Sequence, residues 1–195
     1  VPVNVAPNTF TAKDGVIVST GKPTGILRSA RQYENFILEL EWRHLKPKGN
    51  AGVFVWSAPL TAQGTPFAKS IEVQVLDGHE TANYTSDGDV FAIHGATMKP
   101  DRPHPLGWER CLPSEKRAKP SPAWNHYRIQ CRDGDLKLAV NGKVVSGGSQ
   151  CQPRKGYLCL ESEGSECHFR NLRIKELPSS NPPAEEIAPV VDGFR

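Results

Sequence analysis

The sequence predicts an all-β protein, an antiparallel β-sandwich. Segments in which apolar and polar residues alternate recur along the chain, and turns rich in Gly, Pro and Asn separate them. Segments with helical periodicity are nearly absent. A length of 195 residues with 37% hydrophobic residues suits one folded domain with a single substantial core.

The predicted strands of the first half begin with two short apolar segments. "GVIVST" and "TGILRS" are separated by Gly21 and Pro23. In "YENFILELEWR" the apolar residues from Phe36 to Trp42 fall on one face, which predicts a half-buried strand. "AGVFVWS" is apolar on both faces, so we expect it to be an interior strand of the sandwich.

The segment "IEVQVLDG" alternates in a way that leaves two interpretations. Successive side chains of a strand point to opposite faces, so an apolar row at Ile71, Val73 and Val75 faces the core. Glu72 and Gln74 then face away from the core. They either meet open solvent, as on the wet face of an antiparallel sheet, or line a cleft.

The second half of the chain continues the same pattern. "WNHYRIQCR" alternates and predicts a strand. Asn141-Gly142 within "LKLAVNGKVV" predicts a tight hairpin, because both residues tolerate positive φ. "GYLCLES" and "HFRNLRIKEL" predict two more strands, joined and paired through a turn at Gly164.

The composition changes after the last predicted strand. Prolines and serines dominate "PSSNPPAEEIAP", which is typical of a linker. We therefore expect a domain at residues 1–177, followed at residues 178–195 by a linker and the start of an adjacent domain in a longer parent chain.

Charge and hydropathy argue against two classes of partner. The net charge of +3, from 24 basic and 21 acidic residues, is too evenly balanced to predict nucleic-acid binding. No apolar run approaches the length of about 18 residues that a membrane-spanning helix needs. The main basic excess is a Pro-rich segment from Lys99 to Lys119, which either is a solvated loop or lines a groove that meets a polar ligand.

The five cysteines leave the redox state open. If the strands on either side of Glu163 pair, Cys159 and Cys167 lie opposite each other. A disulfide and two buried thiols are both compatible with that position. The C-x-x-C and C-x-x-H spacings of structural zinc sites are absent from the sequence.

The segment "LDGHETANYTSDGD" is rich in side chains that bind cations. Asp77 begins a turn with Gly78, and His79, Asp87 and Asp89 follow, but the spacing of a Ca²⁺ loop is missing. A turn is the simpler role for Asp77. A divalent metal stays an alternative, and no other cofactor is evident.

Five strings occur in an order and spacing that resemble a known family: "NAGVFVW", "IEVQVLDG", "AWNHYRI", "LAVNGKVV" and "HFRNLRIKEL". From about Asn8 to Leu177 the chain resembles the bacterial 3-keto-disaccharide hydrolase family. The resemblance implies a concanavalin A-like (LamG-type) jelly roll, in which one curved sheet presents a concave face to a carbohydrate. It also implies an exported protein, periplasmic or extracellular. Ala51 stands where the family commonly has Ser, and Glu161 stands where it commonly has Gln, which adds an ionisable group.

The chemistry that the resemblance implies acts on sugars oxidised to a ketone at C3. A base removes the acidic C2 proton, an acid helps the C1 substituent to leave, and water then adds to the product. The candidates for base and acid are Glu72, His94 and Glu161. Asn50 and Gln74 are the candidate donors to substrate oxygens. His94, in "FAIHGA", titrates near neutral pH, although a buried histidine bound to the backbone is the alternative.

Further residues are candidates for contact with a saccharide. Trp56 can stack an indole face on a sugar ring, with core packing as the alternative. Trp108, in the basic Pro-rich segment, could close over a ligand. Arg28 and Asp77 could also reach the cleft, with a surface position and a turn as their respective alternatives.

Three functions remain open on the sequence. The first is a lyase or hydrolase that processes 3-keto-glycosides by elimination and hydration. The second is an ordinary glycoside hydrolase, in which Glu72 and Glu161 form a carboxyl pair about 5 to 9.5 Å apart. The third is a non-catalytic carbohydrate-binding module, because a fold does not fix a function.

Overall fold

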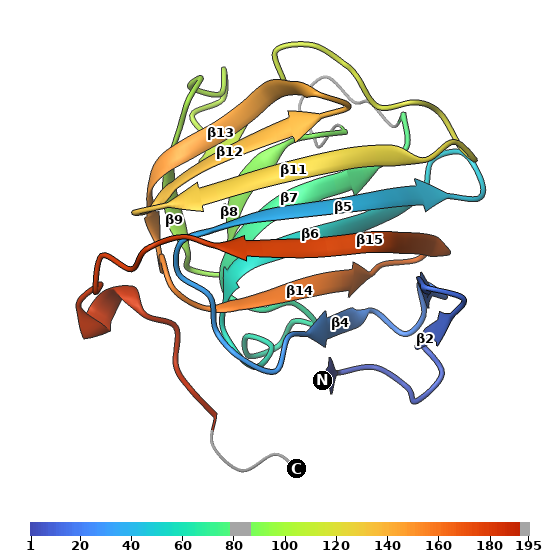
Figure 1. Ribbon diagram of the computed structural model, residues 1–195, viewed down its shortest axis with the longest axis horizontal. Helices are drawn as coiled ribbons and strands as arrows, with labels where there is room; N and C mark the ends of the chain where they lie inside the picture. Colours follow the sequence, from blue (N-terminus) through green and yellow to red (C-terminus); the bar gives the residue numbers. More distant parts are fainter. Residues whose placement is uncertain (79–86, 192–195) are drawn as a thin grey trace.

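The computed structural model describes residues 1–78 and 87–191 and confirms the antiparallel β-sandwich (Figure 1). Among the described residues, the one helical element is a short 3₁₀ turn at Ala184–Glu186. The seven-stranded sheet has the order β1 (Pro2–Val3), β4 (Gly25–Arg28), β14 (Tyr157–Ser162), β6 (Asn50–Ser57), β7 (Ser70–Leu76), β8 (Val90–Ile93) and β10 (Arg110–Cys111). The eight-stranded sheet has the order β2 (Phe10–Lys13), β3 (Val16–Ser19), β15 (Cys167–Glu176), β5 (Phe36–His44), β11 (Asn125–Arg132), β12 (Asp135–Val140), β13 (Lys143–Gln152) and β9 (Thr97–Pro100).

Alternating apolar side chains of the long strands build the core between the two sheets. On β5, every second residue from Phe36 to Trp42 is buried, as its sequence pattern predicts. The ring of Tyr127 on β11 meets that of Trp42 edge-on at 5.3 Å. The Tyr127 hydroxyl donates to the carbonyl of Gln74 in the opposite sheet at 2.7 Å. This hydrogen bond ties β11 to β7, the strand that carries the predicted cleft residues.

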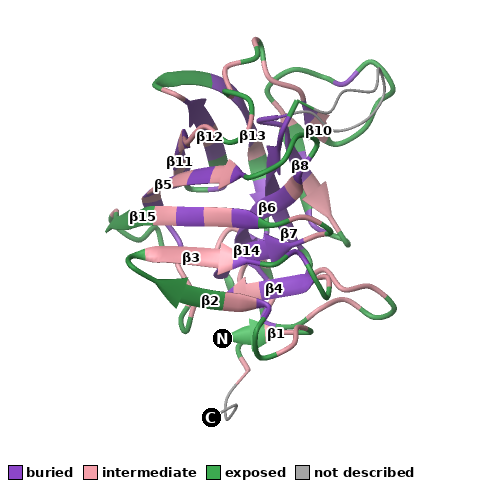
Figure 2. Cartoon of the chain, turned by 90° about the vertical axis from the view of Figure 1, so that its right-hand side faces the viewer, coloured by how far each residue is buried: buried purple, intermediate pink, exposed green. Residues whose placement is uncertain are grey.

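The outer face of the seven-stranded sheet is partly covered as well. Figure 2 shows β6, β7 and β14 as buried strands. A second apolar cluster covers part of that face and consists of Ile26, Phe54, Ala68, Tyr157 and Cys159, with Phe67 packed against it. Phe67 and Ala68 belong to the connection between β6 and β7, so this connection folds back over the sheet. The double coverage explains why "AGVFVWS" is apolar on both faces, and it confirms the prediction of an interior strand.

β14 and β15 belong to opposite sheets, which corrects their predicted pairing. β14 pairs with β4 and β6, whereas β15 pairs with β3 and β5. The turn at Gly164, which has a φ of 78°, carries the chain from one sheet to the other. Cys159 and Cys167 therefore do not pair, and all five cysteines are buried free thiols. Of the two alternatives that the sequence leaves open, the structure excludes the disulfide and confirms the buried thiols.

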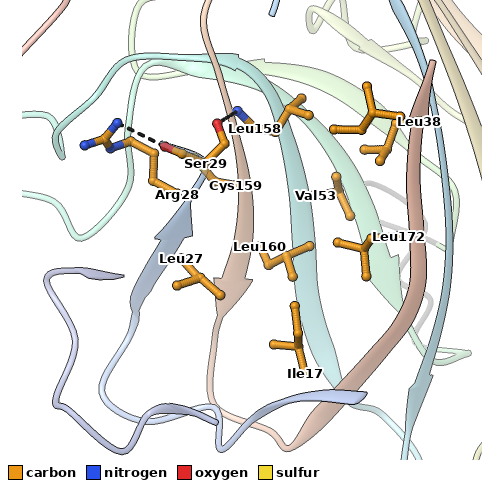
Figure 3. Close-up of a pocket in the computed structure, with 11 residues that line it drawn as sticks. Ile17, Leu27, Arg28, Ser29, Leu38, Val53, Leu158, Cys159, Leu160 and Leu172 are labelled. Atoms are coloured by element: carbon orange, nitrogen blue, oxygen red, sulfur yellow. Dashed lines mark hydrogen bonds between the residues drawn. The ribbon is translucent and has the colours of Figure 1, made fainter. Parts of the chain in front are cut away.

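A small apolar hollow of about 190 Å³ lies where β4 and β14 face β3 and β15 (Figure 3). Its aliphatic walls are Ile17, Leu27, Leu38, Val53, Leu158, Leu160, Leu172 and Ile174. Arg28 stands at its edge with the guanidinium turned away from these walls. That group donates to the carbonyl of Ser29 at 3.1 Å and lies 4.2 Å from the centre of the Tyr157 ring. Local contacts therefore hold Arg28.

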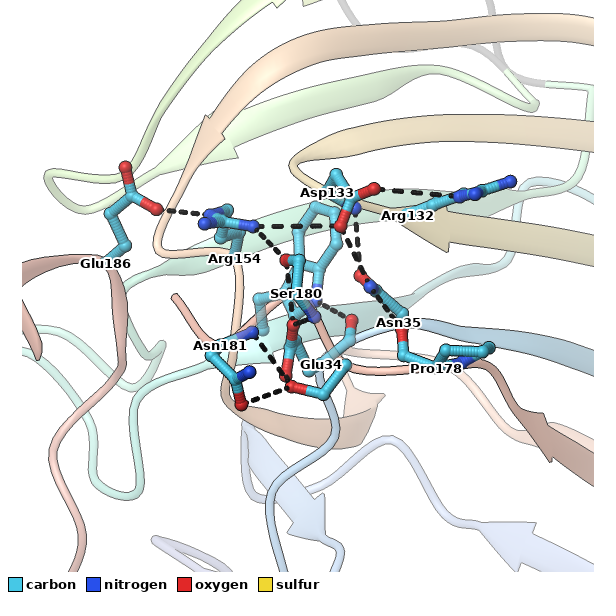
Figure 4. Close-up of polar contacts among 11 residues, drawn as sticks. Glu34, Asn35, Arg132, Asp133, Arg154, Pro178, Ser180, Asn181 and Glu186 are labelled. Carbon is cyan, nitrogen blue, oxygen red and sulfur yellow. Dashed lines mark hydrogen bonds and ion pairs between the residues drawn. The ribbon is translucent and has the colours of Figure 1, made fainter. Parts of the chain in front are cut away.

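Residues 178–191, here called the C-terminal segment, lie against the domain (Figure 4). Glu34, 8% exposed, accepts hydrogen bonds from the backbone N–H of Ser180 at 2.7 Å and from its hydroxyl at 3.0 Å. Arg154 forms an ion pair with Glu186 and donates to the Ser180 hydroxyl at 2.7 Å. The C-terminal segment is thus packed on the domain, and an adjacent domain beyond it stays a prediction.

Candidate functional site

A hollow of about 150 Å³ opens on the outer face of the seven-stranded sheet, next to the second apolar cluster. We call it the carboxyl cavity. Side chains from β6, β7, β8, β10 and β14 and from their connections line it: Asn50, Phe67, Glu72, Gln74, Phe91, Ile93, His94, Arg110, Glu161 and Glu163. Five residues that the sequence singles out therefore meet at one place: Asn50, Glu72, Gln74, His94 and Glu161.

The alternation of β7 has the orientation that a cleft requires. Ile71, Val73 and Val75 are fully buried in the core between the sheets. Glu72 and Gln74 point to the other face and line the carboxyl cavity, where they are only 6% and 2% exposed. Of the two interpretations of this strand, the structure supports the one in which its polar side chains line a cavity and not open solvent.

Gly52 on β6 makes room for two carboxyl groups. It pairs with Gln74 on β7, and Glu161 lies on β14, the neighbour of β6 on the other side. A Cβ atom at position 52 would lie 2.7 Å from Oε1 of Glu72 and 3.0 Å from Oε2 of Glu161. These two oxygens consequently lie within about 6 Å of each other, above a backbone position that has no side chain.

Burial in the cavity raises the pKa of its acids. Burial raises the pKa of Glu72 to about 8, with a further increase from Glu163 and an opposing effect of Arg110. Burial also raises the pKa of Glu161 well above its ordinary value, and the nearby Glu72 and Glu163 add to this shift. Oε2 of Glu161 is buried without a hydrogen-bond partner. Both acids therefore favour the protonated form near neutral pH.

A short chain of side-chain amides orients the third acid. Gln74 Nε2 donates to Oδ1 of Asn50, and Asn50 Nδ2 donates to Oε2 of Glu163. The backbone of Asn50 is fixed in turn by Ser165, whose hydroxyl accepts from its N–H at 2.8 Å and donates to its carbonyl at 3.0 Å. In this structure Asn50 and Gln74 hold a carboxylate, a role that differs from the predicted one of donors to substrate oxygens.

Arg110 brings positive charge to the cavity. The register runs Glu72, Phe91, Arg110 across β7, β8 and β10, so the three side chains share one face. The guanidinium lies 3.7 Å from the centre of the Phe91 ring and donates to Oδ2 of Asp89 at 2.8 Å. Sequence reasoning missed Arg110 and Glu163. In the sequence, Arg110 is only one of several basic residues in a Pro-rich segment, and Glu163 lies in a turn after a strand.

His94 stands at the exposed side of the carboxyl cavity. It follows β8 with a φ of 51°, and its ring stacks on Phe67 at 5.8 Å. Its Nε2 lies 3.4 Å from Oγ1 of Thr65. Partial burial lowers the pKa of His94, so its neutral form is favoured at neutral pH. The alternative of a buried histidine bound to the backbone does not apply, because His94 is exposed.

The structure corrects the predicted role of Trp56 as a sugar platform. A β-bulge in β6 sets Val55 and Trp56 opposite one residue of β14, Leu158, and Trp56 has a φ of 53°. The bulge turns the indole into the core, where it is fully buried and donates from Nε1 to the carbonyl of Glu34 at 2.7 Å. The alternative of core packing is confirmed.

Three other candidate binding residues lie outside the carboxyl cavity. Arg28 is 7% exposed and lies over the ring of Tyr157, so it lies neither in the cleft nor on the open surface. Asp77 is buried at the end of β7, and its Oδ1 accepts from the backbone N–H of Ser121 at 3.1 Å, which supports a structural role. Trp108 is 42% exposed and stacks on His104 at 4.7 Å.

The divalent metal that the sequence leaves as an alternative gains no site from the described residues. Within residues 1–78 and 87–191, no group of three His, Cys, Asp or Glu side chains is arranged to hold a metal ion. His79 lies outside the described residues, whereas Asp87 and Asp89 are buried. In the same part of the chain, no helix has the length and apolar character needed to cross a membrane.

Comparison with known proteins gives the family. A family profile described as the 3-keto-alpha-glucoside-1,2-lyase-like domain matches residues 3–175. The chain belongs to this family. It resembles, at 24% identity, the 3-keto-disaccharide hydrolase of Bacteroides thetaiotaomicron, over 88% of this chain and 71% of that protein. The 3-keto-alpha-glucoside-1,2-lyase-like domain is thus a carbohydrate-active domain with a distant relative named as a hydrolase.

Solved structures confirm the fold of this 3-keto-alpha-glucoside-1,2-lyase-like domain as a concanavalin A-like sandwich. A Parabacteroides distasonis protein, provisionally described as a glycosyl hydrolase, has a TM-score of 0.66 at 24% identity and covers 89% of this chain and 93% of its own. The carbohydrate-binding module CBM66 from Bacillus subtilis has a TM-score of 0.65 at 9% identity, over 90% and 94% of the two chains. At such identities the likeness concerns the fold alone.

Proposed function

We propose that this protein cleaves 3-keto-glycosides at C1 by elimination, followed by hydration of the product. The observation that carries the proposal is the close pair of buried carboxyl groups, Glu72 and Glu161, in a cavity that also holds Arg110. Family membership supplies the substrate class. We further propose that the protein works in the periplasm or outside the cell, which fractionation of the native protein tests.

The reaction begins at C2, next to the ketone. Glu72, as the carboxylate, removes the C2 proton, and the electron pair moves toward the C3 oxygen, where the positive charge of Arg110 stabilises it. The C1–O bond then breaks as a C1=C2 double bond forms, and Glu161 gives its proton to the leaving oxygen. Water adds to C1 in the second stage, with Glu161 as base and Glu72 returning a proton to C2. A base with a pKa of about 8 suits a weakly acidic C–H group.

An ordinary glycoside hydrolase fits the cavity less well. Two oxygens within about 6 Å agree with the carboxyl spacing of a retaining enzyme, roughly 5–5.5 Å. Such an enzyme needs one carboxylate that is ionised at neutral pH as a nucleophile. Here burial raises the pKa of both Glu72 and Glu161, and the charge of Glu163 adds to both shifts, so both favour the protonated form and neither suits the role of a nucleophile.

Turnover of a matched pair of substrates tests the proposal. The rate of release of the C1 group is measured for a 3-keto-glucoside and for the same glucoside unoxidised, with and without a chelator. We expect the ketosugar alone to react, and Glu72→Gln and Glu161→Gln each to lower the rate by about 10²- to 10⁴-fold. Glu39→Gln, at a half-exposed position of the opposite sheet, is the matched control.

Each contrary result favours a different function. Release from the unoxidised glucoside would favour an ordinary glycosidase. Binding of the ketosugar without release, measured by calorimetry, would favour a carbohydrate-binding module. A rate abolished by the chelator would show that a metal, and not Arg110, stabilises the enolate.

A further inference from the structure

We infer that Glu163 is a proton relay between solvent and Glu161. The inference rests on the proposed elimination and assigns a role to a residue that takes no part in the reaction scheme above. Glu161 is 1% exposed, so a proton that it gives up cannot return directly from bulk water. Glu163 lines the same cavity and is partly exposed, at the start of the turn between β14 and β15.

The surroundings of Glu163 hold it in position for this role. Asn50 Nδ2 donates to its Oε2, and the Asn50 amide is itself fixed by Gln74. The turn that follows Glu163 is pinned to β6 through the Ser165 hydroxyl. Residues of β6 and β7 therefore fix both the side chain of Glu163 and the turn that follows it. Few acids in a turn are held at so many points.

The direction of proton transfer follows from the charges that face the pair. The acids facing Glu161 are Glu72 and Glu163, while Arg110 and Asp89 act on Glu72. Burial raises the pKa of Glu161, and the charges of Glu72 and Glu163 and a side-chain hydrogen bond with Glu163 raise it further. Burial raises the pKa of Glu163, and the same hydrogen bond opposes that shift. The proton therefore favours Glu161, and Glu163 is the carboxylate nearer to solvent.

The proton balance of the elimination defines when the relay is needed. One turnover moves the C2 proton onto Glu72 and the Glu161 proton onto the leaving oxygen, so Glu161 ends as a carboxylate. If water adds before the product leaves, the reverse transfers restore both acids. If the unsaturated ketosugar leaves first, Glu163 takes a proton from water and passes it to Glu161, while Glu72, which is 6% exposed, gives its proton to water on the side where its carboxyl group lines the open cavity. The relay then limits the rate of repeated eliminations, and not the first one.

Rapid-mixing kinetics of elimination separate these two phases. In Glu163→Gln, which keeps an oxygen to accept from Asn50, we expect the first turnover at the wild-type rate, giving a burst of about one product per protein. The steady rate that follows should fall about 10- to 100-fold and be restored in part by added formate. Glu163→Asp should retain a faster steady rate than Glu163→Gln. The matched control is Glu166→Gln, an exposed acid of the same turn that pairs with His168.

An unchanged steady rate in Glu163→Gln, or an equal loss in the first and later turnovers, overturns the relay. A second measurement does not depend on turnover. Carbon-13 NMR titration of the glutamate carboxyls should give a lower pKa for Glu161 in Glu163→Gln than in the wild type, and an unchanged value also overturns it. If the wild type releases nothing from a 3-keto-glucoside, the proposed function is wrong. The titration still tests the contact between Glu163 and Glu161, because it needs no turnover, so the two failures can be distinguished.

Discussion

Glu72 and Glu161 lie on strands that never pair with each other, and their carboxyl groups meet above the backbone of the strand between them. β6 separates β7 from β14, and Gly52 is the residue of β6 beneath the two groups. Any side chain at this position would occupy the space that the carboxyl oxygens share. The absence of a side chain thus places two acids together, and their proximity contributes to the raised pKa of Glu161.

Gly52→Ala is therefore expected to damage the site more than the fold. The new Cβ would lie at 2.7 and 3.0 Å from two oxygens at the ends of flexible side chains, which can move aside. We expect the release of the C1 group to fall by about 100-fold, because misplaced catalytic groups cost that much. The melting temperature should change little. Adding Glu72→Asp, which shortens one acid, should recover part of the rate, and a fully active Gly52→Ala would contradict this account.

The buried acid Glu72 predicts a pH-dependent stability. Its pKa is raised to about 8 in the folded protein, so the folded state binds its proton more tightly than the unfolded state. The stabilising effect is complete below the ordinary glutamate pKa and is lost as the pH rises through 8. Glu72→Gln should therefore gain stability relative to the wild type between pH 5 and pH 9, by about 1.4 kcal/mol per unit of pKa shift. Urea unfolding at both pH values measures this, with Glu39→Gln as a control that should show no such trend.

The same pKa predicts the pH profile of activity. Glu72 acts as a base only when ionised, so kcat/KM should rise with pH up to about 8 and level off above it. The rate should also fall at the pH at which Glu161 loses its proton, because the leaving group then has no acid. A rate that is highest at pH 5 and declines toward pH 8 would mean that Glu72 does not act as the base.

Arg110 is expected to stabilise the enolate by its positive charge. Because Arg110 also forms an ion pair with Asp89, the test must change both residues. Asp89, with no exposed side-chain area, loses one partner in Arg110→Met, which should cost a few kcal/mol of stability. The double variant Arg110→Met/Asp89→Asn removes both charges. We expect it to fold and to lose about 10²- to 10³-fold in kcat on the ketosugar, with a smaller change in KM. The control is Arg128→Gln, which changes a half-exposed arginine of the opposite sheet.

The C-terminal segment is expected to stabilise the domain. Glu34 is nearly buried and accepts two hydrogen bonds from Ser180, so Glu34→Ala should lower the free energy of unfolding by about 2–3 kcal/mol. Ending the chain at Leu177 should have a similar or larger effect. Glu185→Gln, at an exposed position of the same segment, should leave the melting temperature unchanged. An equally stable truncated chain would show that residues 178–191 act only as a linker.

Local alternation predicted the part of the site that lies on regular strands. The period of two in "IEVQVLDG" is sufficient to set Glu72 and Gln74 opposite the core residues, because strand geometry leaves one choice of face. The predicted sugar platform failed at Trp56, because a bulge inserts an extra residue and turns the indole to the core. The alternating pattern carries no sign of that bulge.

Long-range pairing explains the residues that the sequence did not reveal. Arg110 reaches the cavity because β10 pairs with β8, and nothing in the loop sequence specifies that partner. The local sequence predicts a hairpin centred on Glu163, whereas the turn there connects opposite sheets. Contacts across sheets depend on the whole topology, which a single sequence constrains only weakly.

The corner between β14 and β15 links the fold to the acid–base chemistry of the cavity. Glu161 belongs to a strand of the seven-stranded sheet, whereas Glu163 stands where the chain leaves that sheet for the other one. The Asn50 amide and the Ser165 hydroxyl hold this corner by hydrogen bonds, where strand pairing has ended. A substitution that loosens the corner would therefore change the proton affinity of Glu161 while both sheets stayed intact.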